Sequence, residues 1–530
     1  MTGGSTTGGL HCLTTAQLLV SGGDDRLTLD ERGLNIYGCR PSPAAMISYS
    51  SSTASNISAA AFNAVRALHF ALGERIRKGE PAPQLYAEGL ETLRARLRGI
   101  YGVAADAGVD VAMTPSGTDL ELVVLTLALA SGQPVTNILV GEDEVGAGCV
   151  LSASGRHYRT ATAITSRVPE GESIAGFDPA RIDLLKINVR QPSGQARPRA
   201  DIISAVGAAV DGALASGRRP IVHVLHRSKT GIVVPGMAEV EQLAARYGAR
   251  IDIAVDACQG RISPANLRHY LAMGAAVMIT GSKFIGGPPF SGFAFIPGTL
   301  SRRLEPADAP FPAGLADYFL RAEMPAGWGA ADKALGDAGA NFGLLLRLEA
   351  AVFELQRLSV LPPDAILQVV TAFEREIRAF VARSRRFDLF IAAEGLRPES
   401  HIDHPFERDM LFTLSLTADP PVMIDEAKAI YQSLHEDRSA VFTDAADIVV
   451  AAEEIHTGQP VRCLKDSEGR ILGTLRLSLS APLISAMAGL DDAALSVRFA
   501  ADFDRIERKV DLLLRDSGRT LDRVLGEAAE

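Results

Sequence analysis

The sequence predicts an α/β fold with a large domain, a smaller C-terminal α+β domain and an N-terminal segment. The large domain is expected to hold a mostly parallel, seven-stranded sheet sandwiched by helices. Two observations favour this fold. Short apolar runs alternate with amphipathic stretches between residues 109 and 297, as in a parallel sheet covered on both faces. The 530 residues are 47% hydrophobic and 22% charged, which is ample for a large core.

The order of these patterns predicts three parts: residues 1–100, with helical periodicity over 59–72 and 84–101, a large domain over 101–335, and a small domain over 336–530. The amphipathic run 341–358 reads as a long helix that bridges the last two parts. For the small domain we expect a helix over 362–383, strands over 387–392 and 410–416, a helix over 423–435 and a hairpin over 461–480.

Composition excludes several classes of function. The formal net charge of −10 argues against a surface for nucleic acid or an anionic membrane. The apolar run 122–130 is much shorter than a membrane span, and the N-terminus lacks the basic start of a secretion signal. The cysteines are few and lack metal-ligand spacing, which predicts reduced thiols in a cytoplasmic protein without a metal. They are Cys12, Cys39, Cys149, Cys258 and Cys463.

The stretch from Ile251 to Lys283 organises the predicted large domain. A buried strand over 251–255 ends at Asp256, and a second apolar run over 277–280 leads to Lys283, 27 residues after the acid. Ligands of a parallel sheet bind off the carboxyl ends of its strands. We therefore expect the carboxylate of Asp256 and the amine of Lys283 to reach one crevice.

A second motif lies upstream, where a strand leads into a helix over 109–132. Ser116, Gly117 and Thr118 stand at the predicted start of that helix. Free backbone amides at a helix N-terminus form a ready anion site, two hydroxyls add donors, and a glycine allows close approach. The alternative is an ordinary N-cap, because Ser and Thr are common there.

Together these residues resemble the core of fold-type I pyridoxal-phosphate enzymes, the aspartate-aminotransferase superfamily, and within it the class V, cysteine-desulfurase-like branch. The resemblance makes residues 101–335 the cofactor-binding domain and implies that Lys283 forms a Schiff base with pyridoxal phosphate and moves the Cα proton of the substrate. It also implies that Asp256 keeps the pyridine nitrogen protonated, that Gln259 bonds the phenolic oxygen and that Ser116 to Thr118 hold the phosphate. It further implies a homodimer.

Other positions follow from the resemblance with alternatives left open. Class V enzymes often place a histidine over the cofactor ring after the strand near 137–149. This chain has none there, so either Val145 lies on the ring face or His157 approaches it. Ser228 would contact the phenolic oxygen or substrate, or belong to a plain turn. Ser282 precedes the lysine. Arg476 would bind the substrate carboxylate, or be a strand arginine exposed to solvent.

The segment 32–58 reads as a coil packed over the body, with a substrate-side segment as the alternative.

The expected activity begins with a Cα carbanion and ends in transamination or in β- or γ-elimination or replacement. Carbon–carbon bond formation or decarboxylation is the alternative, although decarboxylases of this group usually have a histidine before the lysine. A desulfurase is disfavoured because neither Cys258 nor Cys463 is placed like a mobile persulfide carrier. A non-catalytic cofactor-binding sensor is a further alternative, and the chain shows no basic helix-turn-helix that would support it.

Overall fold

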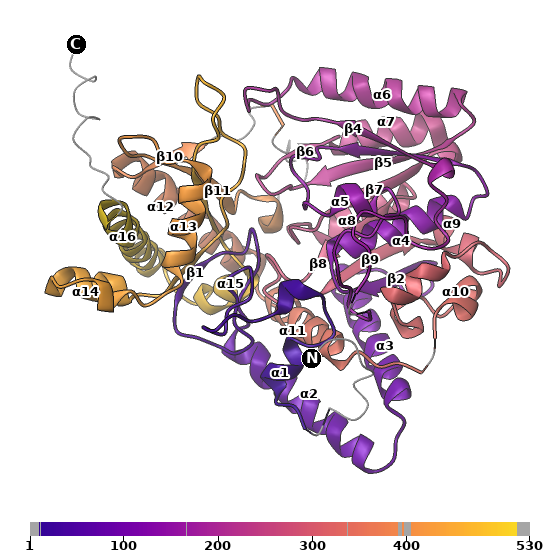
Figure 1. The fold of residues 1–530 in the computed structure, drawn as a ribbon, viewed down its shortest axis with the longest axis horizontal. Helices are drawn as coiled ribbons and strands as arrows, with labels where there is room; N and C mark the ends of the chain where they lie inside the picture. The colour runs from indigo at the N-terminus through magenta and orange to yellow at the C-terminus, as the bar shows by residue number, and fades with distance from the viewer. Residues whose placement is uncertain are drawn as a thin grey trace.

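The computed structural model describes residues 10, 12–165, 167–336, 338–390, 395–396 and 404–516, and shows a large sheet flanked by helices beside a smaller lobe (Figure 1). Within these residues, no helix is both long and apolar enough to cross a bilayer. The described strands form three sheets, one of eight strands, one of three and one of two.

The large sheet has the strand order β2-β9-β8-β7-β5-β3-β4, with the short β6 paired to β5. Pairings from β4 to β8 along this order are parallel, whereas β9 runs antiparallel to both of its neighbours. The predicted mostly parallel α/β sheet is therefore confirmed. Seven strands lie side by side across it, and the two-residue strand β6 is added beside β5. The strands are β2 (Val109–Thr114), β3 (Val135–Val140), β4 (Ile182–Ile187), β5 (Arg219–His226), β6 (Val233–Val234), β7 (Asp252–Asp256), β8 (Ala276–Thr280) and β9 (Gly292–Pro297).

The two faces of this sheet carry side chains of different size, because successive residues of a strand point to opposite faces. One face is lined by large residues such as Val277, Ile279 and Phe293 and packs under α6, α7 and α8. The other face presents small residues to α4. These are Ala112, Ala254, Ala276 and Ala294. The small face lets α4 lie close to the strands, and every residue of α4 from Thr118 to Leu129 is buried.

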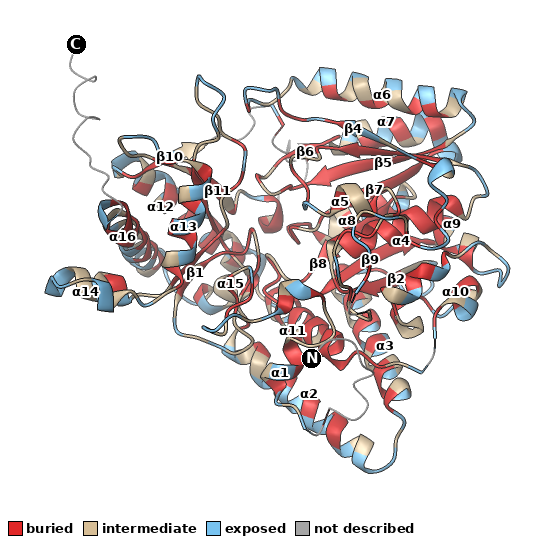
Figure 2. Ribbon diagram, viewed as in Figure 1, coloured by how far each residue is buried: buried red, intermediate tan, exposed pale blue. Residues whose placement is uncertain are grey.

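Short helices complete the large domain and an N-terminal group lies beside it. The large-domain helices are α4 (Gly117–Leu129), α5 (Cys149–Ser152), α6 (Arg199–Ala215), α7 (Met237–Tyr247), α8 (Pro264–Ala272), α9 (Gly298–Ser301) and α10 (Gly329–Ala334). The N-terminal group consists of α1 (Thr15–Leu19), β1 (Ile47–Tyr49), α2 (Ala59–Arg77) and α3 (Ala82–Tyr101). Most of the sheet is buried, although its edge strand β4 is partly exposed, and α2 and α6 expose their outer faces (Figure 2).

The smaller lobe is joined by the predicted long helix, which packs on α2, α3 and α15. Its elements are α11 (Phe342–Ser359), α12 (Pro363–Arg383), β10 (Phe387–Phe390), β11 (Leu411–Leu416), α13 (Ile424–Leu434), α14 (Ala445–Ala452), β12 (Ile455–Thr457), β13 (Thr474–Ser478), α15 (Ala481–Met487) and α16 (Asp492–Asp516). Strands β10, β11 and β13 form an antiparallel sheet, and β12 pairs with β1 of the N-terminal group.

The expected hairpin over 461–480 is confirmed only at its turn. The chain reverses there through an antiparallel bridge between Lys465 and Ile471, with backbone hydrogen bonds from Asp466 to Arg470 and from Leu472 to Leu464. The second arm becomes β13, which pairs in register with β11. Residues 391 and 392 of the expected strand over 387–392 lie outside the described part of the chain.

Candidate functional site

A cavity of about 690 Å³ opens at the carboxyl edge of the large sheet and reaches the smaller lobe. Its wall combines the loops that follow β3, β5, β7 and β8 with residues 52–54 of the N-terminal segment and residues near β13. With the exception of His157, the site residues that the sequence suggested line this one cavity: Ser116, Gly117, Thr118, Val145, Ser228, Asp256, Gln259, Ser282, Lys283 and Arg476.

Asp256 and Lys283 reach the cavity from adjacent parallel strands. Asp256 is the last residue of β7 and is in register with Met278 of β8, five residues before Lys283. The Asp256 carboxylate accepts a hydrogen bond from the Cys258 amide at 2.9 Å. Ser55 donates its hydroxyl to the Lys283 carbonyl at 2.8 Å and its amide to the Ser282 carbonyl at 2.8 Å. The N-terminal segment therefore fixes the backbone at the lysine.

The N-terminus of α4 opens into the same cavity. Ser116 is its N-cap, and the amides of Gly117 and Thr118 are the first of the helix, which have no partner within it. A Cβ added to Gly117 would lie 2.7 Å from the Cys258 Sγ, so this position has no room for a side chain. These features suit an anion, because the end of the helix dipole is positive and its amides point outward.

Asp119 stabilises this helix start from behind. Its carboxylate accepts the Ser116 hydroxyl at 2.7 Å and the Tyr158 hydroxyl at 2.5 Å. Burial raises the pKa of Asp119 to about 6, although both hydrogen bonds and Arg26 oppose the shift. The Ser116 hydroxyl hydrogen therefore already has an acceptor, which leaves the backbone amides of Gly117 and Thr118 as donors to a ligand at this helix end.

Glu144 occupies the loop where the sequence offered no aromatic residue. One of its oxygens accepts two bonds from Arg190, and the other accepts the hydroxyls of Ser228 at 2.6 Å and Thr230 at 2.8 Å. Burial would raise the pKa of this carboxyl, but Arg190 and Lys229 lower it below its usual value. Ser228 thus anchors the loop. To donate its hydroxyl to a ligand, as predicted, it would have to give up its hydrogen bond to Glu144.

Of the two candidates for the ring face, only Val145 is placed at the cavity. His157 is buried beside Tyr318, 2.8 Å from its hydroxyl, and is not among the described residues that line the cavity. Val145 is 7% exposed, and its carbonyl accepts a weak bond from the Lys229 ammonium at 3.4 Å. Lys229 was not singled out from the sequence, although it stands next to Ser228.

Arg476 lies in the wall formed by β13 and is only 3% exposed, so the alternative of a solvent-exposed strand arginine is wrong. Its guanidinium donates to the carbonyls of Gln459, Ser52 and Lys229 at 2.9, 3.2 and 3.0 Å, and to the Thr53 hydroxyl at 2.7 Å. None of the described carboxylates forms an ion pair with it. Burial lowers its pKa to about 10, so it remains a cation at neutral pH.

Gln259 is buried between the N-terminal segment and Arg261. Its amide nitrogen donates to the Ser52 carbonyl at 3.1 Å, and its amide oxygen accepts from Arg261 at 2.8 Å. The second hydrogen of the amide nitrogen remains available to a ligand. Together with the contacts of Arg476, these hydrogen bonds hold residues 51–55 at the cavity. This end of the segment 32–58 therefore lies on the substrate side, as the alternative interpretation of the sequence expected.

A second buried acid lies next to Asp256. Glu121 of α4 and His223 of β5 are 3.5 Å apart and fully buried. Burial lowers the pKa of His223 to about 4 and raises that of Glu121 well above its usual value, with the Asp256 charge adding to the latter shift. Both shifts favour the uncharged forms of the pair. The sequence does carry a signal for this buried acid, because Glu121 stands alone within the apolar run of α4.

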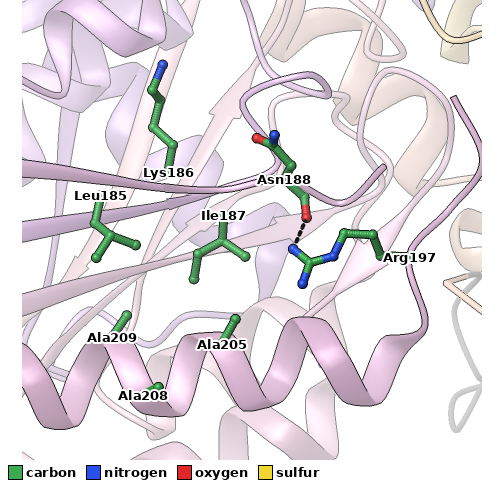
Figure 3. A pocket seen from close by; sticks show the side chains of 8 residues that line it. All are labelled: Leu185, Lys186, Ile187, Asn188, Arg197, Ala205, Ala208 and Ala209. Carbon is green, nitrogen blue, oxygen red and sulfur yellow. Dashed lines mark hydrogen bonds between the residues drawn. The ribbon is translucent and has the colours of Figure 1, made fainter. Parts of the chain in front are cut away.

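A separate hollow of about 540 Å³ lies on the edge strand β4 against α6 (Figure 3). Its wall is mainly aliphatic, with Leu185, Ile187 and alanines of α6, and Arg197 donates to the Asn188 carbonyl at 2.8 Å. None of the described residues that line it is an acid or a histidine. The cavity at Lys283 is therefore the candidate active site.

A scan of family models found no match to this chain, and neither did a search of curated proteins. Solved structures do resemble it. A NifS-like protein from Rickettsia africae is 11% identical, covering 89% of this chain and 99% of its own, with a TM-score of 0.51. The cystine C-S lyase C-DES, solved with cysteine persulfide, is 14% identical over 87% and 98% with a TM-score of 0.49. A TDC from Oryza sativa, solved with PLP and tryptamine, is 13% identical over 88% and 84% with a TM-score of 0.47. The chain thus has the fold of the NifS-like protein, as its resemblance to fold-type I enzymes predicts.

Proposed function

We propose that the protein is a pyridoxal-phosphate-dependent enzyme that acts on an amino acid by removing its Cα proton. The product would arise by transamination or by β- or γ-elimination or replacement. One observation carries the proposal: an amine and an acid stand at the ends of adjacent parallel strands and line one cavity with a free helix N-terminus. Lys283, Asp256 and the start of α4 provide these three features.

The residues present fit the cofactor. The amides of Gly117 and Thr118, which open into the cavity at the start of α4, would hold its phosphate. Asp256 would hold the protonated pyridine nitrogen, and Gln259 would offer its remaining amide hydrogen to the phenolic oxygen. Pyridoxal phosphate, when bound, supplies an electron sink for the charge that develops at Cα.

The protein's own side chains would perform the remaining tasks. Lys283 would bond the cofactor and, once released, carry the proton at Cα, a transfer that contributes roughly 10²–10⁴-fold in such reactions. Arg476 would bind the α-carboxylate, since it is a buried guanidinium without a carboxylate partner among the described residues. Its hydrogen bonds to residues 52, 53, 229 and 459 fix its position before substrate arrives.

Other outcomes from the same Cα chemistry are the second candidates. Decarboxylation or carbon–carbon bond formation would need the same Lys283 and Asp256. A persulfide-carrying cysteine is disfavoured, because Cys463 is buried and its pKa is raised to about 12 by burial. Cys258 packs against Gly117 rather than on a mobile loop. We further propose a cytoplasmic homodimer, and light scattering of the purified protein tests the dimer.

The test is a covalent one. Purified protein supplied with pyridoxal phosphate should absorb in the visible and, after borohydride reduction, carry the cofactor mass on the peptide with Lys283. Lys283→Ala should lose this adduct, whereas Lys333→Ala, on the exposed face of α10, should keep it. An adduct on another lysine, or none in the wild type, would overturn the proposal. A spectral change on adding amino acids separates an enzyme from a scaffold or a sensor that ignores them.

A further inference from the structure

The cavity is lined by many more cations than acids, although the chain as a whole has a net charge of −10. The cations are Arg26, Arg159, Arg227, Lys229, Lys283, Lys428, Arg462 and Arg476. The acids are Glu144, Glu170 and Asp256. A cleft with one sign of charge concentrates ligands of the opposite sign.

Half of these cations are already paired with carboxylates outside the lining. The pairs are Arg26 with Asp24, Arg159 with Asp25, Arg227 with Asp409 and Lys428 with Asp425. For the described residues, the structure gives no carboxylate within 4 Å of Lys229, Lys283, Arg462 or Arg476. Arg462 is exposed, so water solvates its charge.

Lys283 and Arg476 have tasks in the proposed function, and Lys229 does not. It follows Ser228 in the loop after β5, and among the described residues its ammonium forms one weak hydrogen bond, to the Val145 carbonyl at 3.4 Å. Burial lowers the pKa of Lys229, and Arg476 lowers it further, while Glu144 opposes the shift. Lys229 is half-buried, and an ammonium that is partly shielded from water without a strong partner is costly, so its position favours an anion.

Glu144 does not supply that anion directly. Both of its oxygens are bonded, one by Arg190 and the other by the Ser228 hydroxyl and by the amide and hydroxyl of Thr230. The Lys229 ammonium is not among these donors. Its contact to Val145 places the ammonium toward the β3 loop, whereas Arg476 is held by residues 52 and 53 of the N-terminal segment and also donates to the Lys229 carbonyl at 3.0 Å. The two residues are thus neighbours in the cavity wall, while their charged groups have different hydrogen-bond partners.

We propose that the substrate is an amino acid whose side chain carries a second anionic group, and that Lys229 binds this group. This inference rests on the proposed function, in which Arg476 binds the α-carboxylate. The second group is a carboxylate, a sulfonate or a phosphate, since each offers oxygens to an ammonium. Lys229 is therefore a specificity-determining residue that leaves the chemistry at Cα unchanged.

The first experiment measures binding without turnover. Calorimetry compares succinate and glutarate with butyrate and valerate, which lack the second carboxylate. The dicarboxylates should bind about tenfold more tightly or better, the gain expected of a charge-assisted hydrogen bond. Lys229→Met should lose this preference and bind all four weakly, whereas the matched control Lys333→Met should keep it.

Equal binding of the two classes, or a preference that survives in Lys229→Met, would overturn the inference. Reduced cofactor affinity in Lys229→Met would do so as well, because it would assign the ammonium to the cofactor phosphate. The cofactor adduct of the wild type is measured in a separate experiment. If that adduct is absent, the proposed function is wrong, whereas the anion preference is tested only by the calorimetry. Spectral titration with aspartate, glutamate, cysteate and O-phosphoserine then identifies the group, with alanine and norleucine as neutral references.

Discussion

Replacing Gly117 by alanine tests whether the start of α4 is packed as tightly as the structure shows. The added Cβ would lie 2.7 Å from Cys258 Sγ and 3.1 Å from Thr280 Cγ2, both inside van der Waals contact. The backbone at Gly117 needs no left-handed conformation, so steric overlap is the only penalty. Overpacking of this kind costs about 1–3 kcal/mol, while the better helix propensity of alanine returns at most ~1 kcal/mol.

A double-mutant cycle isolates this overlap. Cys258→Ala removes the sulfur and leaves a small void, which costs about 1 kcal/mol. In Gly117→Ala/Cys258→Ala the new methyl occupies that void, so the double variant should be more stable than the sum of the single changes by about 1–2 kcal/mol. Urea unfolding of the four proteins measures the free energies of unfolding. The single glycine variant should also bind pyridoxal phosphate more weakly, because the helix start must shift.

Additivity of the two changes to within ~0.5 kcal/mol would refute this reasoning, since residues in contact are expected to be coupled. So would a Gly117→Ala protein with unchanged stability and unchanged cofactor affinity. Gly207→Ala on α6 is the matched control, because a Cβ there meets no atom within 4 Å and alanine should stabilise that helix slightly.

Three further changes test other parts of the site. The pKa of Asp119 is about 3.9 in the unfolded chain and is raised to about 6 in the folded protein. The stability that protonated Asp119 contributes is therefore present at low pH and is lost as the pH rises between these two pKa values. Asp119→Asn should therefore gain stability relative to wild type between pH 4 and pH 7 in urea unfolding, and a constant difference would contradict the assignment. Glu121→Gln should change the free energy of unfolding at pH 7 by less than about 1 kcal/mol, because a neutral acid is replaced by a neutral amide; a loss of about 3–5 kcal/mol would show an ion pair with His223. Arg476→Lys should retain the cofactor but bind amino acids about tenfold more weakly in spectral titrations, because the planar guanidinium is lost; unchanged affinity would remove the arginine from the carboxylate site.

The parts of the site that were predictable from the sequence are those that depend on a local pattern. Asp256 and Lys283 each follow a buried strand, so their arrival at one edge follows from the rules of parallel sheets. The start of α4 was visible as small polar residues between a strand and an apolar helix. These three positions needed no knowledge of distant contacts.

The remaining parts depend on pairing across the chain, which carries no local signal. The first arm of the expected hairpin over 461–480 does not form a strand, and the partner in register with β13 is β11, which is remote in sequence. Lys229 has the sequence context of a turn residue, and only its half-buried position beside Val145 and Arg476 distinguishes it. Helix α16 was missed although it has an amphipathic pattern and contributes buried residues such as Phe499 and Phe503. The contacts of residues 51–55 were equally invisible.

The N-terminal segment is hydrogen-bonded to two distant site residues, and this has a consequence for biosynthesis. Ser55 bonds the backbone at Lys283, and Ser52 and Thr53 bond Arg476. One wall of the cavity joins residues separated by more than 400 positions. A nascent chain therefore exposes an incomplete, cation-lined crevice until β13 has left the ribosome. Contacts between residues so far apart in the sequence also form late in folding. We expect stalled nascent chains that end before residue 474 to show no borohydride-trapped cofactor, whereas released full-length chains do. Efficient trapping on the shorter chains would show that the large domain alone completes the crevice.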